Sequence, residues 1–306
     1  MRRAIVTGAD GFLGRHLVPM LEYQGVSVTT LTRRSVLPGG SIAMGDAPWC
    51  PTRLATIVEA AAPDVIFHLA GGASGSAAEL ERSNNELTAS VIQGLREAQA
   101  RPLLVCCGSA AEYGAAIIDG VPVDETTTCA PVSAYGVSKL AQTNAVLDYS
   151  METGTPVLVA RIFNPIGPGM PSYLALGDFV RQIATLPSHG VLQTGNIQVY
   201  RDFIDVRYVT QALYRLACNT SARGIVNVCS GEATQLSRLV ELLICISDKN
   251  IAIQPIAARM RAGEPNVVVG STALLGRFGA AMPRTNYTDV IAGIWSDAQT
   301  RWDPPT

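Results

Sequence analysis

Two side chains that can move a proton lie four residues apart in the segment Tyr135-Gly-Val-Ser-Lys139. In a helix this spacing places the phenol and the ammonium on one face. The nearby positive charge favours the phenolate, so Tyr135 can donate or accept a proton, while Lys139 can also hold a cofactor ribose. Ser109 follows the apolar run 103–107 and offers a hydroxyl at the carboxyl end of a predicted strand, where parallel sheets bind ligands. We therefore predict that Ser109, Tyr135 and Lys139 are the catalytic residues.

A glycine-rich turn lies between the first predicted strand and the first predicted helix. It reads Thr7-Gly8-Ala9-Asp10-Gly11-Phe12-Leu13-Gly14. Gly8 allows the tight turn, Gly11 lets the backbone approach a pyrophosphate at the helix N-terminus, and Gly14 lets the helix lie close to the sheet. A plain tight turn is the alternative interpretation. The position directly after the opening strand favours a dinucleotide site that the whole turn lines.

The residues about 20 positions beyond the glycines set the choice between NAD and NADP. An NAD site usually has an acidic residue there to bind the ribose hydroxyl, whereas this chain has Arg33 and Arg34. Two guanidinium groups can pair with the additional phosphate of NADP. We therefore predict NADP, with NAD or a solvated basic loop as the alternatives. Asp46 is a predicted acceptor for the adenine amino group, and a carboxylate in a surface turn is the alternative.

Alternating strands and helices are predicted to position these residues. Apolar runs indicate strands, and a period of 3.6 residues indicates helices. In the first half the predicted strands are 3–7, 26–31, 65–70, 103–107 and 157–162, and the predicted helices are 12–23, 52–62, 85–99 and 134–152. Strands that are apolar on both faces imply a parallel sheet covered on both sides. The predicted fold class is α/β, with a Rossmann-type doubly wound parallel sheet.

The alternation of strands and helices is less regular in the second half of the chain. Predicted helices at about 175–186, 206–218 and 235–246 alternate there with short strands at 225–228 and 251–254. We predict a smaller C-terminal α/β part that binds the substrate, and no linker rich in Gly or Ser separates it. The predicted dinucleotide-binding domain comprises residues 1–165 and about 202–232, and the substrate-binding part comprises about 166–201 and 233–306.

Charge and composition exclude several classes of function. The 306-residue chain has 23 Lys and Arg against 25 Asp and Glu, a net charge of −2, so it has no basic field to hold nucleic acid or an anionic membrane. No apolar run is long enough for a signal-peptide core or a membrane span. Seven scattered cysteines predict reduced, mostly buried thiols and no metal site, and we expect a cytoplasmic protein.

Several motifs follow one another in a characteristic order. They are the glycine turn, His68-Leu69-Ala70-Gly71, Ser109-Ala-Ala-Glu-Tyr-Gly114, Tyr135-x-x-x-Lys139, Arg161-Ile-Phe-Asn164 and Arg201-Asp-Phe-Ile-Asp205. In this order they resemble the extended short-chain dehydrogenases/reductases that act on nucleotide sugars, over essentially the whole chain. The C-terminal half resembles the GDP-6-deoxy-D-mannose reductases of that family, in the stretches 178–183, 195–196, 227–231, 258–265 and 269–270.

The resemblance implies hydride transfer at carbon four of a sugar ring. It implies that Tyr135 protonates the developing alkoxide, that Ser109 hydrogen-bonds the same oxygen, and that Lys139 tunes the phenol and grips the ribose. It places Asn84 where it helps to position the active site. The implied cofactor-binding residues in the motif that begins at His68 are Leu69, Ala70 and Gly71. The implied substrate-binding residues are Asn164, Asn196, Arg201, Arg261 and Glu264. For the two arginines, which would grip the diphosphate, surface salt bridges are the alternative.

The chain departs from the family pattern beside Ser109. Cys107-Gly108 precedes a single hydroxyl residue where the family commonly has two. In the related 4,6-dehydratases a glutamate lies two residues after the catalytic hydroxyl residue, but here Ala111 occupies that position and Glu112 follows it. A shift of one residue in an extended chain turns a side chain to the opposite side, so we expect no dehydratase activity. Tyr208 replaces a frequent Asp, and the sequence offers no mechanistic account of that change.

The leading hypothesis is NADPH-dependent reduction of the C4 keto group of a nucleotide-linked 4-keto-6-deoxy sugar of the GDP-4-keto-6-deoxymannose type. One alternative is an NAD-dependent nucleotide-sugar 4-epimerase that uses the same Tyr135 and Lys139. The other is a catalytically silent dinucleotide-binding protein. The resemblance also implies a homodimer that packs through helices at about 83–99 and 134–152.

Overall fold

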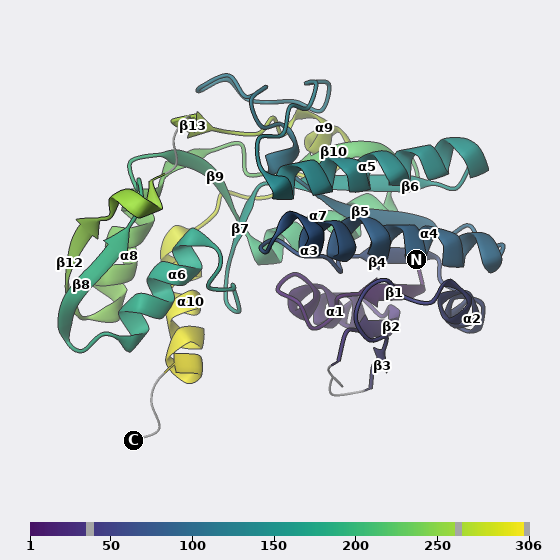
Figure 1. The fold of residues 1–306 in the computed structure, drawn as a ribbon, viewed down its shortest axis with the longest axis horizontal. Helices are drawn as coiled ribbons and strands as arrows, with labels where there is room; N and C mark the ends of the chain where they lie inside the picture. Colours follow the sequence, from purple (N-terminus) through teal and green to yellow (C-terminus); the bar gives the residue numbers. More distant parts are fainter. Residues whose placement is uncertain (35–39, 261–264, 303–306) are drawn as a thin grey trace.

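The larger part of the molecule is a seven-stranded parallel sheet (Figure 1). The computed structural model describes residues 1–34, 40–260 and 265–302. The strand order is β3-β2-β1-β4-β5-β6-β10, so the winding direction reverses between β1 and β4, as in doubly wound dinucleotide-binding sheets. The strands are β1 (Arg3–Thr7), β2 (Ser27–Thr32), β3 (Ile42–Ala43), β4 (Val65–His68), β5 (Leu103–Ser109), β6 (Val157–Ile162) and β10 (Gly224–Val228). This confirms the predicted fold class.

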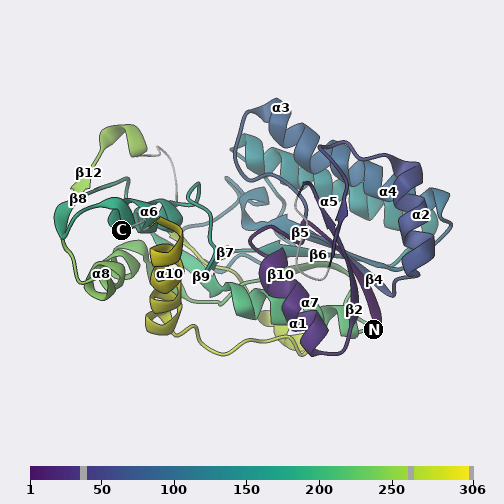
Figure 2. The same cartoon turned by 90° about the horizontal axis from the view of Figure 1, so that it is seen from below.

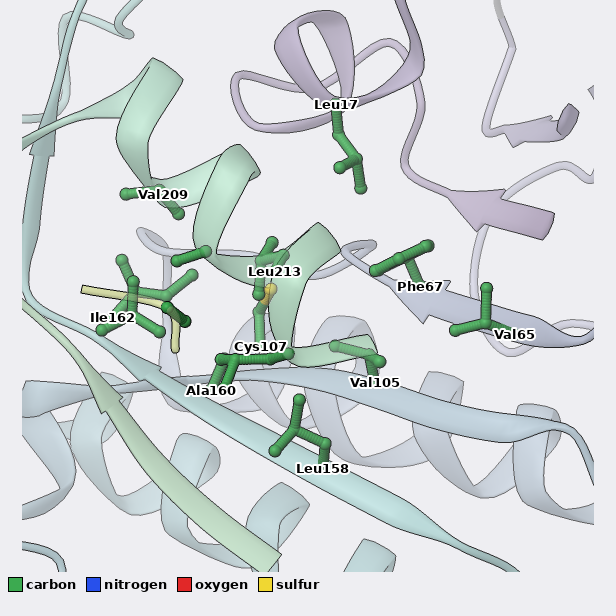
Figure 3. Packing of buried hydrophobic residues seen from close by; sticks show 14 of the residues in the cluster. Leu17, Val65, Phe67, Val105, Cys107, Leu158, Ala160, Ile162, Val209 and Leu213 are labelled. Carbon is green, nitrogen blue, oxygen red and sulfur yellow. The ribbon is translucent and has the colours of Figure 1, made fainter. Parts of the chain in front are cut away.

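Helices cover both faces of the sheet (Figure 2). One face carries α1 (Gly14–Tyr23), α7 (Val206–Cys218) and α9 (Ala273–Arg277), and the other carries α2 (Pro51–Ala61), α4 (Leu87–Glu97) and α5 (Ala134–Thr153). Alternate residues of a strand enter different cores: Val65 and Phe67 face α1, whereas Ile66 faces α2 and α4. Figure 3 shows the first of these cores, in which Leu17 of α1 and Leu213 of α7 lie against side chains of the sheet such as Phe67. The continuous apolar runs in the sequence follow from this double burial.

The smaller part has its own sheets and its own core. A four-stranded sheet contains β7 (Asn164–Ile166), β9 (Tyr200–Asp205), β11 (Ala233–Gln235) and β13 (Val267–Val268), and a parallel pair contains β8 (His189–Thr194) and β12 (Asn250–Pro255). The helices α6 (Ala175–Thr185), α8 (Leu236–Ser247) and α10 (Tyr287–Trp302) enclose a core that includes Phe179, Leu239 and Ile294. The helices predicted at 175–186 and 235–246 are confirmed, and α10 was not predicted.

Two places in the structure bear on the predicted boundary between the two parts. Residues 202–205 belong to β9, which pairs with β7, β11 and β13 and not with the seven-stranded sheet. Leu275 and Ala280 are buried in the core beside α7, although the sequence assigned this segment to the substrate-binding part. Ile204 of β9 is itself buried in the core beside α7, so the chain crosses between the two parts here and the predicted division stays a prediction.

Local differences appear around the predicted helix 85–99. The helical segment begins earlier, with α3 (Ala77–Leu80) followed by the π-helical turn η1 (Glu81–Glu86) and then α4. Such π-turns often occur at functional sites. The strand predicted at 65–70 ends at His68, and the helix predicted from residue 12 begins at Gly14.

The cysteines are less buried than predicted. Cys106 and Cys107 lie in different cores on opposite sides of the sheet, as adjacent residues of one strand must. Cys229 is also buried, but Cys50, Cys218 and Cys245 are exposed. Within the described ranges, no helix is both long enough and apolar enough to cross a membrane.

Candidate functional site

The glycine turn has the geometry that a dinucleotide site requires. Gly8 has a positive φ of 66°, and a Cβ on it would lie 2.8 Å from the backbone nitrogen of Ala70. A Cβ on Gly14 would lie 2.3 Å from the carbonyl oxygen of Gly8. Gly14 therefore lets the helix approach its own turn, whereas we had predicted a close approach to the sheet. Gly11 is exposed, and its nearest crowding atom is the Gly8 oxygen at 3.1 Å. The turn therefore presents open backbone to a ligand.

The N-terminus of α1 follows directly. Its N-cap residue, Leu13, makes no side-chain cap hydrogen bond, and the Arg15 and His16 N–H groups donate to the carbonyl oxygens of Gly11 and Leu13 at 3.0 and 3.2 Å. The positive end of the helix dipole lies at this turn and favours an anion there. Asp10 lies in the same turn, half-buried. Phe12 packs against the core of the smaller part and meets His16 edge-on at 5.9 Å, and His16 Nε2 lies 2.8 Å from the carbonyl oxygen of Pro168. The turn thus contacts both parts of the molecule.

The predicted selectivity residues form one exposed cluster. Arg34 donates to Asp46 Oδ2 at 2.7 Å, and Arg33 Nε lies 3.8 Å from the other oxygen of Asp46. The hydrogen bond from Arg34 lowers the pKa of Asp46. In the absence of a ligand, Asp46 is therefore the counter-ion of the two arginines that were predicted to bind a phosphate.

The loop after β4 lies beside the glycine turn. The Ala70 N–H donates to Thr7 Oγ1 at 3.1 Å, and Leu69 precedes it, half-buried. Asn84, in the π-turn, donates to Gly72 O and to Ser138 Oγ, both at 3.0 Å, and accepts the Gly72 N–H. A Cβ on Gly71 would lie 2.5 Å from Asn84 Oδ1. Asn84 therefore ties this loop to α5, the helix that carries Tyr135 and Lys139.

A buried chain of polar groups connects Lys139 with the glycine turn. Lys139 Nζ donates to Gln142 Oε1, and Gln142 Nε2 donates to Thr88 Oγ1 at 2.7 Å. His68 Nε2 lies 3.0 Å from Thr88 Oγ1, and its Nδ1 lies 2.9 Å from Thr7 Oγ1. All five residues are almost completely buried. The sequence had placed His68 near the cofactor, but it revealed neither Gln142 nor Thr88 as its partners.

The hydrogen bonds of Thr88 determine the state of His68. The Thr88 hydroxyl donates its one hydrogen to Asn84 O at 2.6 Å and accepts from Gln142. His68 Nε2 must therefore donate to Thr88, which leaves Nδ1 to accept from Thr7. Complete burial, together with the charge of Lys139, lowers the pKa of His68 to about 3. His68 is a neutral bridge at neutral pH.

The turn after β5 brings Ser109 to the N-terminus of α5. Residues Ala110–Glu112 form a 3₁₀ turn, and Ser109 Oγ accepts the Ala111 N–H at 3.2 Å. A Cβ on Gly136 would lie 2.5 Å from the carbonyl oxygen of Ala111. The first turn of α5 therefore packs closely against the segment that follows Ser109. Ser109 and Tyr135 are both half-buried, whereas Lys139 is buried.

Glu112 is buried in an ion pair and is not open to solvent. It is fully buried, and its carboxylate binds Arg161 Nε at 2.8 Å and Thr143 Oγ1 at 3.0 Å. The predicted orientation of Glu112 thus holds, but our reason for it was wrong: the segment is a 3₁₀ turn and not an extended chain. A carboxylate held in this ion pair is not placed to exchange protons with a substrate.

The predicted substrate-binding residues lie in three places. Asn164 is half-buried in β7 and donates to Asp202 O at 3.0 Å. Asn196 is exposed in the turn after β8, where its Oδ1 accepts the Gln198 N–H. Arg201, in β9, donates to the carbonyl oxygens of Tyr200 and Pro265 at 2.8 and 3.0 Å. Arg261 and Glu264 lie outside the described residues.

Asp202 is a buried carboxylate that the sequence did not single out. Oδ1 accepts the N–H and the hydroxyl of Ser230 at 2.7 and 2.6 Å, and Oδ2 accepts the Gly231 and Gly270 N–H groups at 2.9 and 3.1 Å. Burial raises the pKa of Asp202, although these hydrogen bonds oppose the shift. Asp202 thus joins β9 to the ends of β10 and β13. Its place inside the motif Arg201-Asp-Phe-Ile-Asp205 was the available signal.

Tyr208 also has a structural explanation. Its side chain is half-buried and packs on the core between the sheet and α7. No cluster of His, Cys, Asp or Glu among residues 1–34, 40–260 and 265–302 could hold a metal ion.

Comparisons with known proteins show the family to which this chain belongs. The family model described as the NAD dependent epimerase/dehydratase family matches residues 4–229. GDP-6-deoxy-D-mannose reductase from Pseudomonas aeruginosa is 32% identical over 312 residues, which cover 98% of both chains. dTDP-6-deoxy-L-talose 4-dehydrogenase (NAD(P)(+)) from Kitasatospora kifunensis is 32% identical over 250 residues, 79% of this chain and 78% of the relative.

Solved structures show the same fold. The structure of RMD from Pseudomonas aeruginosa complexed with NADPH superposes with a TM-score of 0.83 at 29% identity, covering 98% of this chain and 100% of the other. UDP-glucose 4-epimerase from Brucella ovis in complex with NAD has a TM-score of 0.86 at 21% identity, covering 98% and 99%. The family model matches most of the chain and the relative matches nearly all of it, so this chain is an enzyme that belongs to the NAD dependent epimerase/dehydratase family.

Proposed function

We propose that this protein is an NADPH-dependent reductase of the C4 keto group of a nucleotide-linked 4-keto-6-deoxy sugar, of the GDP-4-keto-6-deoxymannose type. The observation that carries the proposal is the contact between the first turn of α5 and the segment after Ser109, where Gly136 approaches Ala111. We infer that this contact brings the hydroxyl of Ser109 near Tyr135 and Lys139. The full-length likeness to a GDP-6-deoxy-D-mannose reductase supports the choice of substrate.

The glycine turn fits a dinucleotide. Its exposed backbone at Gly11 and the uncapped N-terminus of α1 can receive the pyrophosphate. Arg33 and Arg34 can receive the additional phosphate of NADP, which would displace Asp46 from Arg34. The reduced cofactor supplies the hydride when it is bound. We propose that the seven-stranded part binds this cofactor and that the smaller part binds the nucleotide sugar.

The side chains of this site can then handle the proton. Tyr135 donates a proton to the oxygen at carbon four as negative charge develops on it, and the Ser109 hydroxyl donates a hydrogen bond to the same oxygen. Lys139, anchored by Gln142, stabilises the phenolate that remains and binds the ribose. Asn164 lines the same side of the crevice, and Arg201 grips the substrate diphosphate.

Substrate turnover tests the proposal directly. Purified protein mixed with NADPH and GDP-4-keto-6-deoxymannose should consume NADPH, followed by its absorbance. The dTDP-linked analogue tests the nucleotide preference. Failure with both substrates overturns the proposal. Interconversion of UDP-glucose and UDP-galactose without added cofactor, by protein that copurifies with NAD, would select a 4-epimerase instead.

The arginine pair gives a separate test of the cofactor. Arg34→Ala should raise the KM for NADPH at least tenfold, because it removes one ionic contact to the additional phosphate, and should leave the KM for NADH within about threefold. Arg53→Ala is a matched control, since Arg53 is exposed and donates to a backbone carbonyl oxygen in β3. Equal changes for both cofactors would contradict an NADP site.

We also propose a homodimer that packs through α4 and α5. Val137 and Met151, which are 54% and 77% exposed, lie fourteen residues apart on α5 and hence on nearly the same side. Apolar side chains that recur on one helix face are typical of a covered surface. Light scattering should give twice the chain mass, and Val137→Glu should shift it towards the monomer. A monomeric unmodified protein would overturn this proposal.

A further inference from the structure

A buried carboxylate lies directly behind Ser109. Glu112 is 0% exposed. Its Oε1 accepts the Ser109 backbone N–H at 2.7 Å, and its Oε2 accepts from Arg161 Nε at 2.8 Å and from Thr143 Oγ1 at 3.0 Å. Every oxygen of the carboxylate therefore has a donor, and the three donors come from three different elements.

The chain makes room for this carboxylate at Gly108. A Cβ on Gly108 would lie 2.6 Å from Glu112 Oε1 and 3.2 Å from Arg161 Cγ. Gly108 and Arg161 are opposite one another in the register of β5 and β6. Any side chain at residue 108 would push Glu112 or Arg161 aside. The glycine that departs from the family pattern is thus explained by the carboxylate beside it.

Arg161 depends on Glu112 for its counter-charge. Its side chain is 3% exposed, and its guanidinium lies over the Tyr113 ring at 4.7 Å. Nη1 has no hydrogen-bond partner within the described part of the chain. A buried guanidinium requires a nearby negative charge, and Glu112 supplies it. The carboxylate therefore has two separable tasks, one towards Arg161 and one towards Ser109.

The contacts of Glu112 define the position of Ser109 relative to α5. Thr143 lies on α5 about two turns after Tyr135, so its contact with Glu112 ties the turn after Ser109 to the helix that carries the phenol. The Ser109 N–H is held by Glu112, and the Ser109 hydroxyl oxygen is held by the Ala111 N–H. Small displacements of reacting groups cost large factors in rate.

We propose, on the basis of the proposed function, that Glu112 is a positioning residue that fixes Ser109 against Tyr135 by accepting the Ser109 N–H. Arg161 and Thr143 hold the carboxylate in place for this purpose. Glu112 itself exchanges no proton with the substrate.

Two variants separate the two tasks of the carboxylate. Glu112→Gln keeps the shape and one carbonyl oxygen for the Ser109 N–H, but it loses the charge. The double variant Glu112→Ala/Thr143→Glu moves the negative charge to α5, where it can reach Arg161, and leaves the Ser109 N–H without its acceptor. Glu152→Gln is the matched control, because it removes an exposed carboxylate of α5 that pairs only with Arg96 among the described contacts.

Steady-state kinetics with NADPH and the keto sugar, together with Tm, should separate the two tasks of Glu112. Glu112→Gln should keep kcat within about threefold and lower Tm. The double variant should regain the Tm that Glu112→Ala loses, yet its kcat should fall about 10- to 100-fold with an unchanged KM for NADPH. The reverse order, with kcat restored by the double variant and lost in Glu112→Gln, would show that Glu112 only neutralises Arg161 and would overturn the proposal.

Amide exchange keeps the proposal testable if the double variant does not fold or if no keto sugar is turned over. The Ser109 amide should exchange at the unmodified rate in Glu112→Gln and at least tenfold faster in Glu112→Ala. Equal exchange in these two variants overturns the proposed contact. An unmodified protein that reduces neither keto sugar overturns the proposed function instead, so the two failures are distinct.

Discussion

His68 should make the stability of this protein depend on pH between 7 and 5. The residue is fully buried, and its two ring nitrogens are committed to Thr88 and Thr7 as donor and acceptor. A second proton on the ring would replace the acceptor at Nδ1 with a donor and would add a charge near Lys139. The folded protein therefore accommodates only the neutral imidazole of His68, whereas the unfolded chain accommodates both the neutral and the protonated form.

The magnitude follows from the difference in pKa between the two states. Burial lowers the pKa of His68 from 6.5 to about 3 in the folded protein. A lowered pKa stabilises the fold above the unfolded value of 6.5, and this contribution is lost as the pH falls towards 3. Each pH unit below 6.5 removes about 1.4 kcal/mol. Acidification from pH 7 to pH 5 should therefore lower the free energy of unfolding by about 2 kcal/mol through His68 alone.

Urea unfolding, followed by the fluorescence of the buried Trp49 and Trp295, measures this change. His68→Gln cannot titrate, so the difference in unfolding free energy between the unmodified protein and this variant should shrink by about 2 kcal/mol from pH 7 to pH 5. His189→Gln controls for the loss of a histidine at an exposed position of β8. A difference that stays constant within about 0.5 kcal/mol between the two pH values would refute the assigned neutral state.

Three further substitutions, one of them with a matched control variant, test other parts of the structure. Tyr135→Phe should lower the rate of NADPH oxidation by about 10²- to 10⁴-fold and leave NADPH binding intact by calorimetry; a near-normal rate would exclude Tyr135 as the acid. Gly8→Ala should weaken NADPH binding at least tenfold, because its Cβ would lie 2.8 Å from Ala70. The control is Gly279→Ala, because Gly279 has φ of 71° and open space around it, and its replacement should cost only about 1 to 2 kcal/mol of backbone strain. Equal loss of NADPH binding in both variants would contradict the role of the Gly8 contact. Asp202→Asn should lower the free energy of unfolding by about 1 to 3 kcal/mol, because at least one backbone N–H loses its acceptor; an unchanged chemical unfolding curve would argue against that network.

The sequence alone was sufficient for features that depend on near neighbours in the chain. A strand buried on both faces must be apolar at every position, and this is how the strands around Ile66 and Val105 could be predicted. The glycine turn and the pair Tyr135 and Lys139 follow from spacings of a few residues, which helix and turn geometry convert directly into positions. The parallel direction of the strands in the large sheet then follows from the alternation of strands and helices.

Only the tertiary structure decided which buried polar groups meet. Glu112 and Arg161 are 49 residues apart, and His68 lies 61 residues from Thr7. Their pairing depends on strand register and on the helix that covers each strand, and local periodicity contains neither. The same reason explains why the sequence did not show how β9 pairs, because its place in a sheet is set by contacts with β7 and β11. Spacing along the chain thus determined which residues can do chemistry here, whereas long-range packing determined the partners that hold them in place.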